Sequence, residues 1–304
     1  MKPSFYAPKR EVNTLWLALR FFGNNWLFLS CIFLIGITIQ YNFENLIRVF
    51  PALVLDLQTV KIEELTAMSF IEKLTVYNTG WIIAKAIVNS LIVAIIIIAM
   101  KELAQLLESR NDNKALYEIT DLKAHVSLAT TFKSFFILLF SWQVLKISLF
   151  AVWRSLQFVL VFMAISFIVS AITYNFGDAV VSILYLLFRI FNIMLPIIVT
   201  TLAIFERKSF AGYFIDFKNL FTVRAADFFN SIVFVSIVLV VTPMLMILLY
   251  ALMSILGSSL NITSVTDFIN QFAADYITGF LTDLYIVVIF MVIYVYKRKA
   301  KEKS

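Results

Sequence analysis

The chain has 304 residues, of which 62% are apolar and only 14% are charged, and its formal net charge is +6. Soluble domains are about 45–50% apolar and about 25% charged, so this composition is typical of a polytopic membrane protein. Cys31 and His125 are the only cysteine and histidine. This excludes an intrachain disulfide and the metal or haem sites that need several such ligands, and we expect no cofactor.

The first element in chain order is an amphipathic segment, 9–23, which leads directly into an apolar run at 24–41. Because no small-residue cleavage site follows that run, we expect it to be retained as a membrane span and not removed as a signal peptide. Segment 9–23 is expected to lie in the membrane interface, with Lys and Arg toward the lipid head groups. Its apolar residues recur at helical spacing: Val12, Leu15, Trp16, Leu19 and Phe22.

Five later segments are also apolar over about 20 residues, the length that crosses a bilayer. Together with 24–41 they give six expected spans. A second amphipathic segment, 207–228, carries an aromatic stripe and is expected to lie in the interface. The five spans are 80–100, 155–174, 179–204, 229–256 and 277–296. The stripe consists of Phe210, Phe214, Phe217 and Phe221.

The number of spans depends on segment 132–153, which is apolar but carries Lys146 near the middle of its 134–153 core. If it lies in the interface, six spans place 20 of the 25 Lys and Arg residues on the side of both termini and three on the other. If it crosses the membrane, nine Lys and Arg residues lie on the side of the N-terminus and 13 lie on the other side. A Lys at mid-span also costs about 2.5–3.5 kcal/mol on insertion scales. The positive-inside rule therefore favours six spans with both termini in the cytoplasm.

We thus expect one all-α membrane domain over residues 1–304, located in a bacterial cytoplasmic membrane. An interfacial helix would precede each odd-numbered span, at 9–23, 132–153 and 207–228. Each would be followed by a helical hairpin, and this order suggests a threefold repeat. An unrepeated bundle of the same helices is the alternative, because the second interfacial segment is longer and less cleanly amphipathic than the other two.

A family resemblance is carried by three stretches: LWLALRFFGNNWLFL, FAGYFIDFKNLFTVRAADFF and PIIVTTLAIFERKSF. In these stretches and in the order of its spans, the chain resembles a group of bacterial membrane proteins. That group includes the membrane domain fused to some glycerophosphodiester phosphodiesterases. The resemblance implies a six-span integral membrane protein. It implies no reaction, because the catalytic domain of those enzymes has no counterpart in this sequence.

Few charged residues interrupt the expected spans. Arg189 and Asp283 should reach similar depths in spans 179–204 and 277–296, and Lys85 lies in span 80–100. A charge at such depth usually faces the bundle interior and has a partner, so we expect Arg189 to pair with Asp283. The pair could orient helices, or it could line an outward-facing cavity for an anionic group. The complete candidate polar seam is Lys85, Asn89, Arg189, Asn192 and Asp283.

No phosphate-binding loop, activated nucleophile or carboxylate pair is recognisable, so we do not expect an enzyme. The first hypothesis is a scaffold, assembly or envelope-maintenance protein that contacts membrane lipids and a protein partner at its cytoplasmic face, and no nucleic acid. The alternative is a transporter or flippase for a small anion or lipid, acting through the polar seam. A lipid-modifying enzyme would have to use scattered interfacial acids, namely Glu206, Asp216 and Asp227.

Overall fold

The computed structural model of the chain describes residues 13–49, 70–124, 141–173, 194–223, 225–260 and 263–302. These residues form helices and turns and contain no strand, which confirms the all-α prediction for the part described. A further helix covers Met194–Phe205. The labelled helices are α1 (Thr14–Asn24), α2 (Trp26–Val49), α4 (Phe70–Arg110), α6 (Trp142–Thr173), α8 (Phe210–Val223), α9 (Ala225–Leu260) and α10 (Thr263–Glu302).

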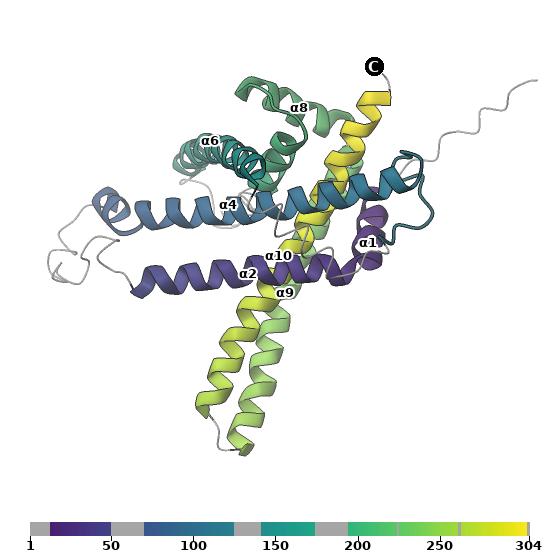
Figure 1. Cartoon of the computed structure of the whole chain (residues 1–304). Helices are drawn as coiled ribbons and strands as arrows, with labels where there is room; N and C mark the ends of the chain where they lie inside the picture. The colour runs from purple at the N-terminus through teal and green to yellow at the C-terminus, as the bar shows by residue number, and fades with distance from the viewer. Residues whose placement is uncertain are drawn as a thin grey trace, which may run out of the picture.

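Helix α10 is the centre of the molecule. Every residue from Tyr285 to Val295 is buried, as expected for a helix that is apolar all round. It packs against α9, α1, α2 and α4. Figure 1 shows α9 and α10 as a long pair that crosses α2 and α4, which run side by side. Helix α6 packs against α4.

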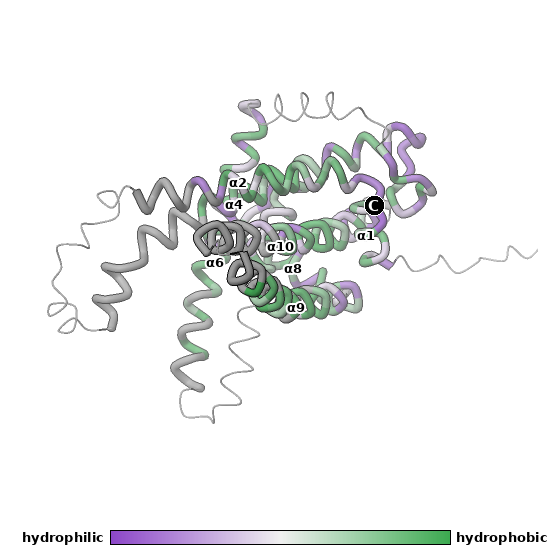
Figure 2. Tube along the Cα trace, turned by 90° about the horizontal axis from the view of Figure 1, so that it is seen from below, coloured by the Kyte–Doolittle hydropathy of each residue, from purple (hydrophilic) through white to green (hydrophobic). Residues whose placement is uncertain are grey.

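Apolar side chains remain exposed along the outer helices. On α9 they include Met244, Ile247 and Ile255, each at least 65% exposed, and on α6 they include Leu160. In Figure 2 hydrophobic residues dominate α9, and hydrophilic residues gather toward the end of α4 and the C-terminus. Large exposed apolar surfaces of this kind are lipid-contacting surfaces in a membrane protein. The chain is therefore a helical membrane protein.

Three helices within the described residues are long and apolar enough to cross a bilayer: Ile87–Arg110, Trp142–Phe162 and Gly279–Ala300. Two helix pairs pass the same test of length and apolarity when each pair is taken together, and each pair is bent sharply. Thr14–Asn24 meets Trp26–Gln40 at 88°, and Phe210–Thr222 meets Ala225–Val238 at 90°. Length and composition thus give three candidate spans, or five if each bent pair crosses as one.

The two bends lie where the sequence predicted an interfacial segment to end and a span to begin. Helix α1 falls within 9–23 except for its last residue, and α8 falls within 207–228; residues 9–12 and 224 lie outside the described part. The buried face of α1 is Thr14, Leu17, Ala18 and Phe21. Trp16 and Leu19, which belong to the predicted apolar stripe, are 65% and 45% exposed. The stripe thus faces outward in part, where lipid would lie.

The predicted interfacial segment 132–153, whose residues 132–140 lie outside the described part, does not form a separate helix. The sequence analysis divided 132–153 from a span at 155–174, but α6 runs without a break from Trp142 to Thr173. The basic side chains at this boundary do not interrupt the helix, because Lys and Arg are good helix formers; each also stacks on an aromatic ring one turn earlier. Lys146 Nζ lies 5.3 Å from the Trp142 ring centroid, and the Arg154 guanidinium lies 5.2 Å from that of Phe150. Such stacking shields the charge within the helix.

Candidate functional site

The C-terminal ends of α4, of the Met194–Phe205 helix and of α10 meet at one place. Lys101 of α4 donates a hydrogen bond to the Ile204 carbonyl (2.9 Å), and its Nζ lies 5.5 Å from the Phe205 ring centroid. Arg298 of α10 lies 3.8 Å from the Glu108 carboxylate of α4. These contacts join helix ends that are about 100 and 190 residues apart in sequence.

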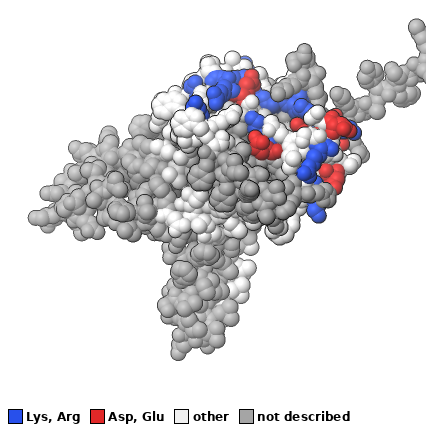
Figure 3. All heavy atoms as spheres, in the orientation of Figure 1, with Lys and Arg blue, Asp and Glu red and all other residues white. Residues whose placement is uncertain are grey.

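A cavity of about 580 Å³ opens between these helix ends and α8. Four of its lining side chains are basic and three are acidic, so the lining carries an excess of one positive charge. Figure 3 shows basic and acidic side chains gathered along this end of the molecule. The polar lining residues are Lys101, Gln105, Glu108, Glu206, Lys208, Asp216, Tyr294, Tyr296, Lys297 and Arg298.

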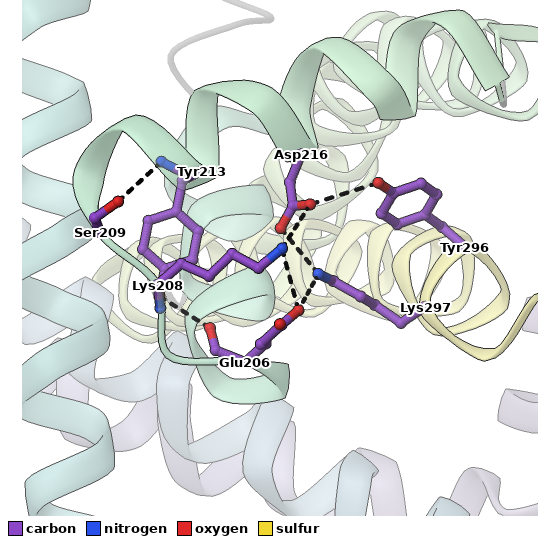
Figure 4. A network of polar contacts seen from close by, with 8 residues as sticks. Glu206, Lys208, Ser209, Tyr213, Asp216, Tyr296 and Lys297 are labelled. Carbon is purple, nitrogen blue, oxygen red and sulfur yellow. Dashed lines mark hydrogen bonds and ion pairs between the residues drawn. The ribbon is translucent and has the colours of Figure 1, made fainter. Parts of the chain in front are cut away.

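Four of these side chains form a closed ring of ion pairs, which we call the ion network: Glu206, Lys208, Asp216 and Lys297. Lys297 Nζ lies 2.7 Å from Glu206 Oε2 and 2.8 Å from Asp216 Oδ2. Lys208 Nζ lies 3.1 Å from Asp216 Oδ1 and 3.3 Å from Glu206 Oε2. Figure 4 shows both ammonium groups between the two carboxylates. Each acid therefore contacts two lysines, and each lysine contacts two acids.

Local structure around the start of α8 holds the ion network in shape. Ser209 caps the helix, because its Oγ accepts from the Gly212 N–H at 3.3 Å. The Tyr213 hydroxyl donates to the Glu206 carbonyl (3.0 Å) and accepts from the Lys208 N–H (2.9 Å). Tyr213 is fully buried, and its hydroxyl holds the backbones of Glu206 and Lys208 together.

A second set of contacts fixes the other wall of the cavity. The Tyr294 hydroxyl donates to the Glu108 carboxylate and accepts from the Leu116 N–H at 3.0 Å. Arg298 donates to the Asn113 carbonyl at 2.8 Å. The turn after α4 is therefore attached to α10, and the cavity has fixed walls on the α4 and α8 sides.

Electrostatics favour the charged forms of two members of the ion network, Glu206 and Lys208. The pKa of Glu206 is lowered by its hydrogen bond from Lys297, against the opposing effect of burial. Burial alone would lower the pKa of Lys208, but the hydrogen bonds and charges of Asp216 and Glu206 outweigh it and the pKa is raised. A carboxylate with a lowered pKa is a poor proton acceptor, and an ammonium with a raised pKa is a poor proton donor.

The predicted polar seam lies only partly within the described residues. Asp283 is buried, and its Oδ2 has no hydrogen-bond partner among them; the same holds for Asn89 Oδ1. Arg189 and Asn192, as well as the side chain of Lys85, lie outside the described part of the chain. The expected contact between Arg189 and Asp283 therefore stays a prediction.

The sequence analysis named Glu206, Asp216 and Asp227 as scattered acids. Two of them converge in the ion network, whereas Asp227 lies elsewhere and accepts a hydrogen bond from Thr14 Oγ1 at 2.8 Å. The analysis used Lys101, Lys208 and Lys297 only to count charges. In the predicted six-span topology, three spans end near these lysines on the same side of the membrane. That arrangement was the signal in the sequence that could have suggested their clustering.

Comparisons with known proteins add no relative. No protein-family model matches the sequence, and no curated protein or solved structure is significantly similar to it. The resemblance to the membrane domain of glycerophosphodiester phosphodiesterases is therefore neither supported nor opposed. Among the described residues, no three His, Cys, Asp or Glu side chains lie close enough together to hold a metal ion.

Proposed function

We propose that this chain crosses a bacterial cytoplasmic membrane six times, with both termini in the cytoplasm. In that arrangement the second, fourth and sixth spans all run toward the cytoplasm, so their C-terminal ends share one side. Seven spans would put the ends of α4 and α10 on opposite faces of a hydrocarbon core about 30 Å thick. The contacts of Lys101 with Ile204 and of Glu108 with Arg298 support six membrane spans over seven.

Two of the three predicted repeat units, each an interfacial helix followed by a helical hairpin, begin with the same helix arrangement. In α1–α2 and in α8–α9, a short amphipathic helix meets a long apolar helix at about a right angle. We extend this to a threefold arrangement in which α6 supplies the second unit with its interfacial and spanning parts joined in one helix. A helix of 32 residues is about 48 Å long, which exceeds the hydrocarbon core.

Within this topology, the function that the site supports best is that of a non-enzymatic scaffold, assembly or envelope-maintenance protein. The observation that carries this proposal is the ion network. Its two carboxylates each contact two lysines, so they join α8, α10 and the short segment before α8 that carries Glu206 and Lys208. These contacts hold α8 as a fixed element at the cytoplasmic end of the bundle. Fixed charges on such a surface would favour a protein partner of complementary charge at the cytoplasmic face.

Site-specific photo-crosslinking tests this role. A crosslinking amino acid would replace exposed Lys218 or Thr222 on α8 and, as a control, exposed Ile247 on α9. A scaffold should give a reproducible protein adduct from the α8 positions in intact cells, and only lipid adducts from Ile247. If neither α8 position gives a protein adduct above the Ile247 background, a cytoplasmic partner on this surface is ruled out.

The topology has its own test. Since Cys31 is the only cysteine, a Cys31→Ser background permits single cysteines to be placed at Lys208, Lys299 and Asn175. Asn175 follows the predicted span 155–174, so a membrane-impermeant thiol reagent should reach Asn175→Cys from the outside of intact cells. Lys208→Cys and Lys299→Cys should react only after the membrane is opened. Labelling of Lys299→Cys in intact cells would overturn the proposed orientation.

A transporter or flippase is the second candidate, and Asp283 favours it. A buried carboxyl in a candidate span, with one oxygen that has no partner among the described residues, is expensive, and such groups commonly serve ion or substrate movement. Arg189→Ala and Asp283→Asn should then abolish flux in reconstituted vesicles while the protein still inserts. Unchanged flux, or loss of the folded protein, would instead assign both residues to helix orientation.

A further inference from the structure

We propose that the cavity at the end of α10 binds a phosphate group, carried by a phospholipid head group or by a free phosphorylated solute. This site does not depend on a protein partner, and it lies apart from the polar seam of the transport hypothesis. Four observations carry the proposal: the position of the cavity along α10, its remaining hydrogen-bond donors, its charge and its size.

The cavity lies at the level where lipid head groups are found. Helix α10 is wholly buried and apolar from Tyr285 to Val295, and then becomes basic at Lys297, Arg298, Lys299 and Lys301. The candidate span Gly279–Ala300 ends within this basic stretch. Basic residues at the end of a span lie among the anionic head groups of the cytoplasmic leaflet. The cavity is lined by the first of these residues, so a phosphate can reach it from the bilayer or from the cytoplasm.

The ion network leaves donors for a ligand. A lysine ammonium has three N–H groups and a guanidinium has five. Lys208 and Lys297 each contact two carboxylates, so one N–H on each has no acceptor among the described residues. Arg298 donates to one carbonyl and has a loose contact with Glu108, which leaves further N–H groups for a ligand. Donors from three basic side chains thus border the same space.

The charge of the lining matches one phosphate ester, and the cavity is large enough to hold it. The excess of one positive charge in the lining favours an anion, and a phosphodiester carries a single negative charge with two free oxygens that accept hydrogen bonds. The volume of about 580 Å³ falls within the range of about 300–1,000 Å³ that small-molecule sites occupy. Because Glu206 and Asp216 hold the two lysines in place, the site is organised before the ligand enters.

The proposal is tested on the purified full chain in an uncharged detergent. One arm titrates inorganic phosphate by calorimetry. The second titrates short-chain phosphatidylglycerol, with diacylglycerol of the same chain length as the uncharged control. Gln105→Glu adds a negative charge to the cavity wall without removing any contact shown by the structure. Lys218→Gln changes the net charge by the same amount on the exposed face of α8, outside the cavity.

We expect Gln105→Glu and Arg298→Gln to weaken phosphate-dependent binding at least tenfold, and Lys218→Gln to change it less than twofold. Binding of phosphatidylglycerol alone identifies a lipid head group as the ligand, and binding of both probes identifies the phosphate itself. The proposal is overturned if neither probe binds, if diacylglycerol binds equally well, or if Lys218→Gln weakens binding as much as Gln105→Glu. Gln105→Glu keeps the test decisive even if Arg298→Gln loosens the turn at Asn113.

Discussion

Lys297 and Asp216 are 81 positions apart in the sequence, yet the ammonium of one lies 2.8 Å from the carboxylate of the other. Their side chains are 11% and 6% exposed, so the pair is largely shielded from water. It joins the last turns of the central helix α10 to the middle of α8. Tyr296 reinforces this junction, because its hydroxyl lies 3.5 Å from the same carboxylate.

Replacing Lys297 by Met should destabilise the protein, because Glu206 and Asp216 would each lose one of their two ionic partners. Hydrogen bonds to charged groups contribute about 1.5–3 kcal/mol, and we expect a loss in this range in the free energy of unfolding. Thermal unfolding in detergent measures it. Lys218→Met on the exposed face of α8 is the control, and it should change stability by less than about 0.5 kcal/mol.

The double variant Lys297→Met, Asp216→Asn separates the pair from its surroundings. If the two residues act through each other, the double variant should be less destabilised than the sum of the single variants by about 0.5–3 kcal/mol. Strict additivity would show that the two side chains contribute independently, and that the pair does not hold α8 to α10.

Two glycines set how closely α2 approaches its neighbours. A Cβ on Gly36 would lie 2.9 Å from Ile92 Cγ2 of α4, and one on Gly279 of α10 would lie 2.8 Å from Ile37 Cγ1 of α2. Isoleucine is stiff at χ1 and cannot easily move aside. Gly36→Ala and Gly279→Ala should therefore each cost about 1–3 kcal/mol, measured by thermal unfolding.

Gly23 in α1 provides the matched control, since a Cβ there meets nothing within 4 Å. Gly23→Ala should leave stability unchanged or raise it by up to about 1 kcal/mol, because Ala favours the helix more than Gly does. Equal effects of all three substitutions would contradict a packing role for Gly36 and Gly279.

Asn25 links the bend between α1 and α2 to the turn after α4. Its amide donates to the carbonyls of Phe21 (3.0 Å) and Leu122 (2.8 Å), and it accepts from the Ala124 N–H (3.1 Å). Asn25 is buried, so Asn25→Ala leaves the Leu122 carbonyl and the Ala124 N–H without this partner. We expect the free energy of unfolding to fall by about 2–3 kcal/mol. Hydrogen exchange at Ala124 should become faster.

Exposed Asn42 is the control for this substitution, because among the described residues its amide donates within α2 alone, to the Thr38 carbonyl at 2.9 Å. Asn42→Ala should leave exchange at Ala124 unchanged. Protection at Ala124 that survives Asn25→Ala would show that the turn is held by other contacts.

The ion network should also give stability a defined pH dependence. Since hydrogen bonding from Lys297 lowers the pKa of Glu206, its stabilisation is complete above the usual value of 4.5 and is lost as the pH falls below it. Lys208 has a raised pKa, so its stabilisation is complete below the usual 10.5 and is lost as the pH rises further. Between about pH 5 and 10 the contributions of Glu206 and Lys208 should be constant.

Thermal unfolding of the wild type and of Glu206→Gln over pH 3 to 11 tests this dependence. Because Glu206 is half exposed, the difference at neutral pH should be no more than about 1 kcal/mol. That difference should shrink below pH 4.5. A difference that persists to pH 3 would mean that the charge of Glu206 does not contribute.

The sequence analysis was most successful where local pattern controls structure. The apolar composition and the helical spacing of apolar residues predicted an all-α membrane protein, and the short helices α1 and α8 coincide with predicted amphipathic segments. The prediction for 132–153 differed from the structure, because the charges of Lys146 and Arg154 were taken to mark a boundary between two elements. Charge affects where a helix lies in the membrane, but Lys and Arg are good helix formers, so α6 continues through both positions.

The sequence alone thus determined the helical class, the membrane environment and the segments that turn sharply, since hydrophobic periodicity and charge act over a few helical turns. Tertiary structure alone decided which charges meet. Glu206, Asp216 and Lys297 belong to segments that no spacing rule connects, and only the packing of three helix ends around α10 brings them within ion-pair distance. The physical reason is that ionic contacts depend on distances in space, which remain undetermined until the apolar helices have packed.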